Sequence, residues 1–165
     1  MDTLTIPSPF GPLLLTLEDG FLTGLSFCDN PPKNRKSPQS GVSEKNRIAA
    51  ECTVRWLTLY FQGTDPDVSV PMRPTGTPFQ KKVWAFLSEV PFGSVLTYGE
   101  LAERIAARES VSSPSPRAVG QALGKNPILL LLPCHRIVPK SGGVGGYAAG
   151  SARKQALLSL EGHLF

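Results

Sequence analysis

The stretch TYGELAERIAARESVSSPSPRAVGQALG, residues 97–124, indicates two short helices joined by a loop. Thr97 and Glu100 have the spacing of a capping box, which satisfies backbone N–H groups at the start of a first helix. Ser115 is a favoured N-cap residue, and the proline that follows it suits the first turn of a second helix, which runs to Gly124. Two short helices connected in this way predict a helix-turn-helix.

Further helices are predicted on both sides of this pair. Thr77 and Gln80 form another capping box at the start of a helix. A last helix is expected to begin at Ser151 and to stop at Gly162. Residues 76–165 are therefore expected to form one mainly helical domain.

The first 75 residues have a different pattern. Two apolar runs that favour strands are separated by Asp19 and Gly20, a strong hairpin signal. Apolar residues at helical spacing predict a helix over 43–61. These apolar residues are Ile48, Cys52, Trp56, Leu59 and Tyr60. A proline-rich segment that follows this helix predicts a linker. We therefore expect two domains: a strand and helix domain with its linker at 1–75, and a second domain at 76–165.

The charge distribution points to the second half of the chain as the binding half. The whole chain carries a net charge of +4. Residues 1–75 hold 7 Lys or Arg against 8 Asp or Glu, a net charge of −1, whereas residues 76–165 hold 10 against 5, a net charge of +5. A polyanionic partner would dock on the second half, although an ordinary solvated basic surface explains the charge equally well.

Composition argues against secretion, a membrane span and a metal site. The three cysteines have no CxxC spacing, no secretory leader is recognised, and the longest apolar stretch, 128–132, is far below the roughly 20 residues that cross a bilayer. We therefore expect a cytoplasmic protein. The only histidines are His135 and His163, so Cys28 and Cys52 lack nearby histidine partners and no metal is expected.

Cys134 lies in an unusual setting, the stretch LLLLPCHRIVPK at 129–140. Because Pro133 cannot donate to a strand ladder, we expect the chain to leave regular structure where the thiol occurs. A thiolate is the reactive form of cysteine, and neighbouring groups such as His135 and Arg136 favour it. Cys134 is therefore predicted to be an activated nucleophile.

A carboxylate near the end of the chain suggests how this nucleophile is activated. Glu161 falls in the last turn of the final predicted helix, where a negative charge is mildly unfavourable. A tolerated, exposed charge is the simpler interpretation. If Glu161 instead orients His135, the three residues form a triad of nucleophile, base and acid. Adjacent side chains of an extended segment point to opposite faces, so Cys134 and His135 would need a bridging water.

These motifs together resemble a known family. The sequence PCHRIV at 133–138, preceded by RAVGQALGKNP at 117–127 and followed by GGVGGYAAG at 142–150, resembles the active site of the O6-alkylguanine-DNA alkyltransferases. The resemblance extends from about Thr77 to Glu161. It implies an α+β protein in which a small N-terminal α/β domain, ribonuclease-H-like, precedes a mainly helical, winged helix-turn-helix domain that carries the active site.

The resemblance implies direct-reversal DNA repair, in which an alkyl (methyl) group moves irreversibly from O6 of guanine to an internal cysteine. The protein would be a single-turnover methyltransferase without a cofactor, and whether O4 of thymine is also a substrate stays open. By resemblance, Cys134 accepts the alkyl group, His135 relays its proton through a water, and Glu161 holds the histidine. Asn126 would order the turn around the site, and Tyr98 would place its hydroxyl near guanine N3.

The implied partner is double-stranded DNA with an alkylated guanine, bound through its minor groove with the damaged base flipped into a pocket. Arg117 would fill the gap left in the base stack. Small residues on the same helix would allow close approach, although ordinary helix packing also explains them. By resemblance, the DNA contacts are Arg117, Ala118, Gly120, Gln121, Thr97 and Arg136, and the substrate pocket is formed by Tyr147, Ala148, Val144 and Gly145.

Two departures from the family and two alternative functions remain. Ala148 stands where many relatives carry a serine, and the loop at 108–116 is longer than expected between the two helices.

A non-catalytic lesion-binding helix-turn-helix protein would have no need for Cys134. A Cys/His hydrolase would turn over many times. The location implied is cytoplasmic on nucleoid DNA, or nuclear in a eukaryote, with no membrane and no obligate protein partner.

Overall fold

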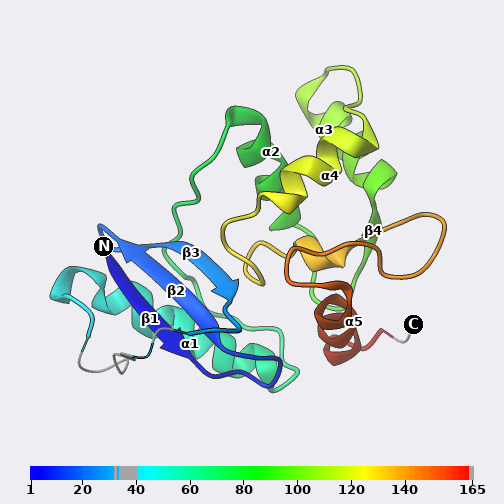
Figure 1. Cartoon of the computed structure of the whole chain (residues 1–165). Coiled ribbons are helices and arrows are strands. Elements are labelled where there is room, and N and C mark those ends of the chain that lie inside the picture. Colours follow the sequence, from blue (N-terminus) through cyan, green and yellow to red (C-terminus); the bar gives the residue numbers. More distant parts are fainter. Residues whose placement is uncertain (32, 34–40, 164–165) are drawn as a thin grey trace. The chain divides into compact units, whose positions relative to one another are not determined.

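The computed structural model describes residues 1–31, 33 and 41–163. The chain divides into two compact units, Met1–Thr75 and Gly76–Phe165 (Figure 1). The first is built on a sheet and the second is mainly helical, so the α+β class predicted from the sequence is confirmed. Among the described residues, none of the helices has the length and apolar character that a membrane span requires.

The first unit contains a three-stranded antiparallel sheet in the order β1-β2-β3 (Figure 1). The strands are β1 (Asp2–Ile6), β2 (Leu13–Glu18) and β3 (Phe21–Phe27). Every second residue of β2 is fully buried, as expected for a strand with one face against a core. Asp19 and Gly20 both have positive φ, 52° and 85°, which is the backbone of a type I′ turn. The predicted hairpin is therefore confirmed.

The helix predicted over 43–61 is present, but it buries a different face from the one expected. It consists of a 3-10 turn, η1 (Glu44–Asn46), and helix α1 (Arg47–Phe61), which packs against β3. Ile48 was expected on the apolar face, yet it is 68% exposed. The buried face is formed by Ala49, Ala50, Thr53, Leu57 and Tyr60. A step of one residue turns a helix by about 100°, so the face that α1 buries is the neighbouring one, with Ala49 and Ala50 in place of Ile48.

Part of the predicted linker is anchored to the first unit. Met72 forms a parallel bridge with Leu22 of β3, through hydrogen bonds from Leu22 N to Pro71 O (2.8 Å) and from Arg73 N to Leu22 O (2.9 Å). The Arg73 guanidinium also lies 3.3 Å from a carboxylate oxygen of Asp19 at the hairpin turn. The segment thus extends the edge of the sheet before the chain enters the second unit.

The second unit begins with three short helices whose predicted caps are confirmed. These helices are α2 (Pro78–Leu87), α3 (Tyr98–Glu109) and α4 (Pro116–Gly124). Both capping boxes are formed, at Thr77 with Gln80 and at Thr97 with Glu100. Ser115 Oγ accepts the backbone N–H of Ala118 at 3.1 Å and so caps α4. α2, α3 and α4 pack on one another, and the indole Nε1–H of Trp84 donates to the carbonyl of Ala122 at 2.9 Å, which ties α2 to α4.

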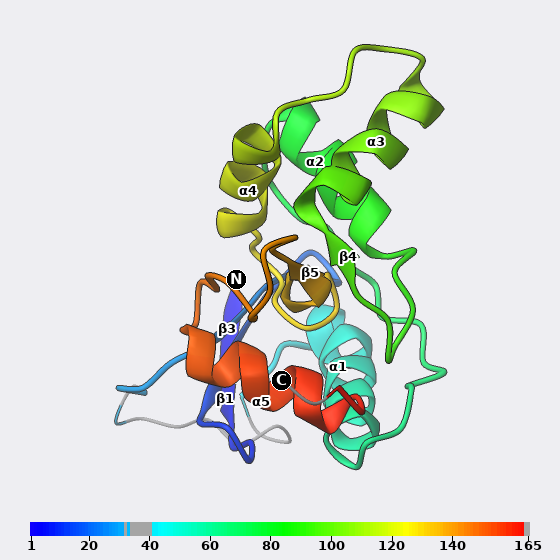
Figure 2. The same cartoon turned by 90° about the vertical axis from the view of Figure 1, so that its right-hand side faces the viewer.

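A small parallel pair of strands joins these helices to the rest of the unit. The pair consists of β4 (Leu96–Thr97) and β5 (Ile137–Val138), which lie side by side (Figure 2). β4 leads directly into Tyr98, and β5 directly follows a 3-10 turn, η2 (Cys134–Arg136). Because the pair is parallel, Tyr98 follows its carboxyl end and Cys134 lies before its amino end. Helix α5 (Ser151–Leu160) then packs against η2.

The backbone at Cys134 differs from the expectation that regular structure ends there. The preceding leucines lie in turns, with a positive φ of 74° at Leu130, and Cys134 instead begins η2. Pro133 occupies the N-cap position of this turn, where a missing N–H costs nothing. The argument that Cys134 and His135 point to opposite faces of an extended segment therefore does not apply.

Candidate active site

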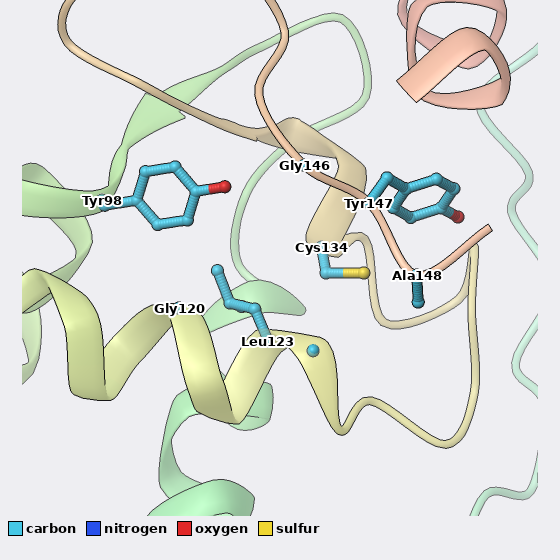
Figure 3. A pocket seen from close by; sticks show the side chains of 8 residues that line it. Tyr98, Gly120, Leu123, Cys134, Gly146, Tyr147 and Ala148 are labelled. Carbon is cyan, nitrogen blue, oxygen red and sulfur yellow. The ribbon is translucent and has the colours of Figure 1, made fainter. Parts of the chain in front are cut away.

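Cys134 lies in a pocket of about 330 Å³ that is formed within the second unit. Its walls come from the start of α3, from α4, from η2 and from the glycine-rich loop before α5 (Figure 3). The lining includes Tyr98, Gly120, Leu123, Cys134, Tyr147 and Ala148. Apart from Leu123, these residues were proposed for one site, and the structure brings them together although the sequence separates them by up to 50 positions.

The sulfur of Cys134 is almost completely buried, with 6% of the residue exposed. Burial raises the pKa of the thiol above its ordinary value, while a hydrogen bond from Asn126 and the positive charge of Lys154 act in the opposite direction. The sequence predicted neighbours that favour the thiolate, and the structure reverses the balance because desolvation outweighs them. The resting form is a protonated thiol, which needs a base to become a nucleophile.

The candidate base is His135, which a buried hydrogen bond to Glu161 holds in place. His135 is fully buried, and its Nε2 lies 2.7 Å from Oε1 of Glu161 at the end of α5. Burial lowers the pKa of His135, against the hydrogen bond and charge of Glu161, which raise it. A neutral ring that donates Nε2–H to the carboxylate carries its lone pair on Nδ1. His135 is thus arranged to accept a proton on Nδ1.

The guanidinium of Arg136, a predicted DNA contact, is buried and is used inside the protein. Its Nε donates to Oε2 of Glu161 at 2.9 Å, its Nη2 donates to Oε1 at 3.0 Å, and its Nη1 donates to the carbonyl of Val90 at 2.7 Å. Only 7% of the residue is exposed. The donors of Arg136 face the carboxylate and the 90–93 turn, which does not favour the predicted DNA contact.

The Glu161 carboxylate is held ionised by these neighbours. Burial on its own would raise its pKa, but the hydrogen bonds and charges of His135 and Arg136 outweigh burial and lower the pKa to about 2. The backbone N–H of Gly93 lies 3.4 Å from Oε2. Glu161 is therefore no tolerated surface charge but a buried anion with donors on both oxygens.

Asn126 holds the turns that lead into Cys134. Its amide Nδ2 donates to the carbonyl of Leu132 at 2.7 Å, and its Oδ1 accepts the backbone N–H of Ile128 at 2.9 Å. These bonds satisfy buried backbone groups of a segment that belongs to neither helix nor sheet. The side chain also favours the Cys134 thiolate through a hydrogen bond.

Two tyrosines line the pocket with different orientations (Figure 3). The hydroxyl of Tyr98 points into the pocket, and burial, followed by the charge of a Cys134 thiolate, raises its pKa, so it remains a donor. The hydroxyl of Tyr147 points away from Cys134 and is buried without a hydrogen-bond partner in the described part of the chain. A Cβ at Gly145 would stand 2.8 Å from the Pro139 ring and 3.6 Å from the Tyr98 hydroxyl, so glycine keeps this wall close.

The residues proposed for DNA contact on α4 (Pro116–Gly124) do not all lie on one face of the helix. Gly120 lines the Cys134 pocket, with room for no more than a Cβ before Tyr98. Ala118 and Gln121 instead line a second hollow of about 520 Å³, which α4 forms with the start of α2. Arg117 is exposed at the start of α4, whereas the hydroxyl of Thr97 is occupied as a helix cap. Val144 is half-buried in the glycine-rich loop.

Lys154 is a residue of the site that the sequence analysis missed. It is 1% exposed on α5, and its Nζ donates to the carbonyls of Ile137 (2.6 Å) and Gly146 (3.1 Å). It therefore joins the strand that follows η2 to the loop that forms the pocket wall. Burial lowers its pKa to about 8. The available signal was its position three and four residues before the buried Leu157 and Leu158, on the apolar face of the helix.

The buried Lys154 predicts a rise of stability with pH. Its pKa is about 8 in the folded protein and 10.5 as its ordinary value, so the unfolded chain binds more protons between these pH values. The free energy of unfolding of the wild type, minus that of Lys154→Met, should increase by about 1–2 kcal/mol between pH 7.5 and 9.5. Urea unfolding across this range measures it. Lys140→Met, at an exposed position, is the control and should show no such slope.

The sequence predicts that no metal is bound by Cys28 and Cys52, the two cysteines outside this pocket. Cys28 and Cys52 are half-buried free thiols of the first unit. Within residues 1–31, 33 and 41–163, no group of three or more His, Cys, Asp or Glu is placed to hold a metal ion. The absence of a metal stays a prediction.

Fold and site define a class of protein: an α+β protein whose helical domain holds a buried thiol, a histidine–carboxylate pair and an exposed arginine on a short helix. The family models agree with this class. Residues 78–163 match the DNA binding domain of 6-O-methylguanine DNA methyltransferase, and residues 3–74 match its ribonuclease-like domain. The chain belongs to the 6-O-methylguanine DNA methyltransferase family, as the active-site resemblance predicted.

Individual relatives cover nearly the whole chain. Methylated-DNA--protein-cysteine methyltransferases of Metallosphaera sedula and Methanosarcina acetivorans are each 39% identical, over 97% and 94% of this chain and 92% and 94% of their own. The crystal structure of the Mycobacterium tuberculosis protein OGT in complex with DNA is similar with a TM-score of 0.80 and 35% identity, covering 98% of this chain and 92% of that one.

Proposed function

We propose that this chain repairs alkylated DNA by moving an alkyl group from O6 of guanine to the sulfur of Cys134. The observation that carries the proposal is the buried Cys134 thiol in a pocket of about 330 Å³, next to the His135–Glu161 pair. The names of the curated relatives support the same reaction. The substrate is methylated DNA, and the protein is at once enzyme and final acceptor.

The reaction balances as a displacement at carbon. The thiol proton of Cys134 passes to Nδ1 of His135 through a bridging water, and the Glu161 carboxylate stabilises the imidazolium that forms. A sulfur–carbon bond forms as the bond from O6 to the alkyl carbon breaks. The Tyr98 hydroxyl donates a hydrogen bond to N3 of the leaving guanine. The base takes up one proton and His135 releases the thiol proton, so that neutral guanine and a neutral imidazole result. The product is a thioether, from whose alkyl carbon the Cys134 thiolate is a very poor leaving group, so each protein molecule acts once.

Double-stranded DNA is the partner, and the damaged base is bound flipped out. A sulfur that is 6% exposed cannot reach an atom inside a base stack, so the nucleotide must enter the pocket. The complex of the similar M. tuberculosis protein with DNA supports this partner. We place the minor groove on α4, where Gly120 allows close approach and Arg117 fills the vacated stack.

The two units take different parts in this function. Binding and transfer belong to residues 76–165, and the ribonuclease-like unit at 1–75 is the accompanying N-terminal domain. We place the protein in the cytoplasm, on chromosomal DNA, or in the nucleus if its host is a eukaryote. No cofactor and no protein partner takes part in the step.

The experiment that tests the function counts transfers. The protein is incubated with an excess of duplex DNA that contains O6-methylguanine, and the methyl groups on protein are measured by intact mass. One methyl group per molecule is expected, on the peptide that contains Cys134. Many equivalents of demethylated DNA per protein would indicate a hydrolase, and binding without any transfer would indicate a lesion-binding protein.

Replacing Arg117→Ala should slow transfer from duplex DNA by roughly 10-fold or more, because base unstacking costs a few kcal/mol that the arginine would offset. Transfer from free O6-benzylguanine, which needs no flipping, should change little. Arg104→Ala removes another exposed arginine, from α3, and is the control. Equal losses of rate on the duplex and on the free base would remove the proposed role.

A further inference from the structure

The Glu161 carboxylate is shared between two neighbouring residues of one turn. His135 and the Arg136 Nη2 approach the same oxygen, Oε1, at 2.7 and 3.0 Å, while Arg136 Nε approaches Oε2 at 2.9 Å. This side-on pair fixes the plane of the carboxylate, since planar guanidinium and carboxylate groups match in geometry. A histidine hydrogen bond alone would leave the carboxylate free to rotate.

The turn at 90–93 holds the side chain of Arg136 in place. Its Nη1 donates to the carbonyl of Val90 at 2.7 Å, and its guanidinium lies 5.8 Å from the centre of the Phe92 ring. The next residue of the same turn, Gly93, directs its N–H toward Oε2 of Glu161. The 90–93 turn thus fixes the arginine, and the arginine fixes the carboxylate.

The charge of Arg136 also matters for the histidine. A carboxylate that faced His135 alone would favour an imidazolium, which has no lone pair to accept a proton. The guanidinium neutralises that carboxylate in place. The arrangement keeps a strong hydrogen-bond acceptor beside Nε2 without leaving a net negative charge there.

We infer that Arg136 is a positioning residue for alkyl transfer, which orients Glu161 and keeps His135 a neutral imidazole able to take the Cys134 proton on Nδ1. The inference rests on the proposed alkyl transfer. It assigns to the arginine of the Cys-His-Arg sequence a role inside the proton relay, in place of the DNA contact expected from the sequence.

The groups that face His135 set the direction of the pH effect. They are Glu161 and Lys154 from α5, Cys134 and Arg136 from η2, and Tyr147 from the glycine-rich loop. Burial is the main cause of the low pKa of His135, and the positive charges of Arg136 and Lys154 lower it further. Removal of the Arg136 charge therefore raises the pKa of His135, and the acid limb of the transfer rate moves to higher pH.

The test compares Arg136→Met and Arg136→Lys with the wild type in single-turnover methyl transfer from duplex DNA between pH 5 and 9. Arg136→Met should move the acid limb up by about one pH unit or more, so its rate falls further below that of the wild type as the pH decreases. Arg136→Lys keeps the charge but loses the side-on geometry, so its acid limb should stay near that of the wild type while its rate falls. Arg108→Met, which breaks an exposed arginine pair with Glu89, is the control.

A second measurement does not depend on whether the variants fold. Nitrogen chemical shifts of the His135 ring in the wild-type protein should report a neutral ring with its proton on Nε2 at pH 7. An imidazolium, or a proton on Nδ1, would overturn the inference, as would an unmoved acid limb in a folded Arg136→Met. A wild-type protein that transfers no methyl group would instead refute the proposed function, so the two failures are distinguishable.

Discussion

Cys134→Ser is expected to abolish alkyl transfer, with a loss of rate on the order of 10⁴-fold or more. A serine hydroxyl is far less acidic than a thiol and a much weaker nucleophile toward an alkyl carbon, and burial, which already raises the pKa of the thiol, disfavours an alkoxide still more. The intact mass of the variant should stay unchanged after incubation with O6-methylguanine DNA, while DNA binding persists because the contact surface on α4 is intact.

The matched control is Cys52→Ser. Cys52 is a free cysteine of α1 in the first unit, so this variant should still accept one methyl group at the wild-type rate. A Cys134→Ser protein that still gained a methyl group would place the acceptor elsewhere. The pair of variants therefore separates the pocket thiol from the general reactivity of cysteines in this chain.

Glu161→Gln is expected to lower both stability and transfer. The amide keeps the shape but removes the negative charge, so the buried guanidinium of Arg136 loses its counter-ion, a change that typically costs about 3–5 kcal/mol. His135 also loses the anion that stabilises its protonated form during transfer. Urea unfolding at pH 7 should show the stability loss, and single-turnover assays should show a rate at least about 10² lower.

The pH dependence of that stability difference follows from the carboxylate. The pKa of Glu161 is about 2 when folded and 4.5 as its ordinary value, so the ionised group stabilises the fold fully above 4.5. This contribution is lost as pH falls toward 2. The difference between wild type and Glu161→Gln should therefore be constant near neutrality and shrink below pH 4.5. Glu89→Gln, which alters an exposed pair with Arg108, should show a much smaller difference at any pH, because solvent screens exposed ion pairs.

Local signals predicted the elements of this fold well. The capping boxes at Thr77 and Thr97 and the type I′ turn at Asp19 and Gly20 depend on residues within four positions of one another. Such caps and turns form irrespective of the tertiary contacts that the segment makes. The helical face of α1 was predicted wrongly, because which side of a helix is buried depends on the sheet that it meets, and Ala49 and Ala50 permit an approach that Ile48 does not.

In the candidate site, too, the sequence predicted which residues belong together better than it predicted the local backbone. The sequence motif singled out Cys134, His135, Glu161 and Tyr98, and the structure places Cys134 with Tyr98 in one pocket and His135 with Glu161 in one hydrogen bond. Their roles in transfer stay predictions. Pro133, expected to end regular structure, instead precedes a 3-10 turn, because a short turn needs no ladder partners.

From the sequence alone come the α+β class, the family and the candidate for the reactive thiol, because short motifs and local caps carry that information. Only the tertiary structure decided that Arg136 pairs with Glu161, that Lys154 is buried behind the pocket wall, and that burial raises the pKa of the Cys134 thiol. Each of these depends on desolvation and on contacts between segments far apart in the chain, such as the 46 residues that separate Arg136 from Val90. Sequence spacing does not specify such contacts until the fold has formed.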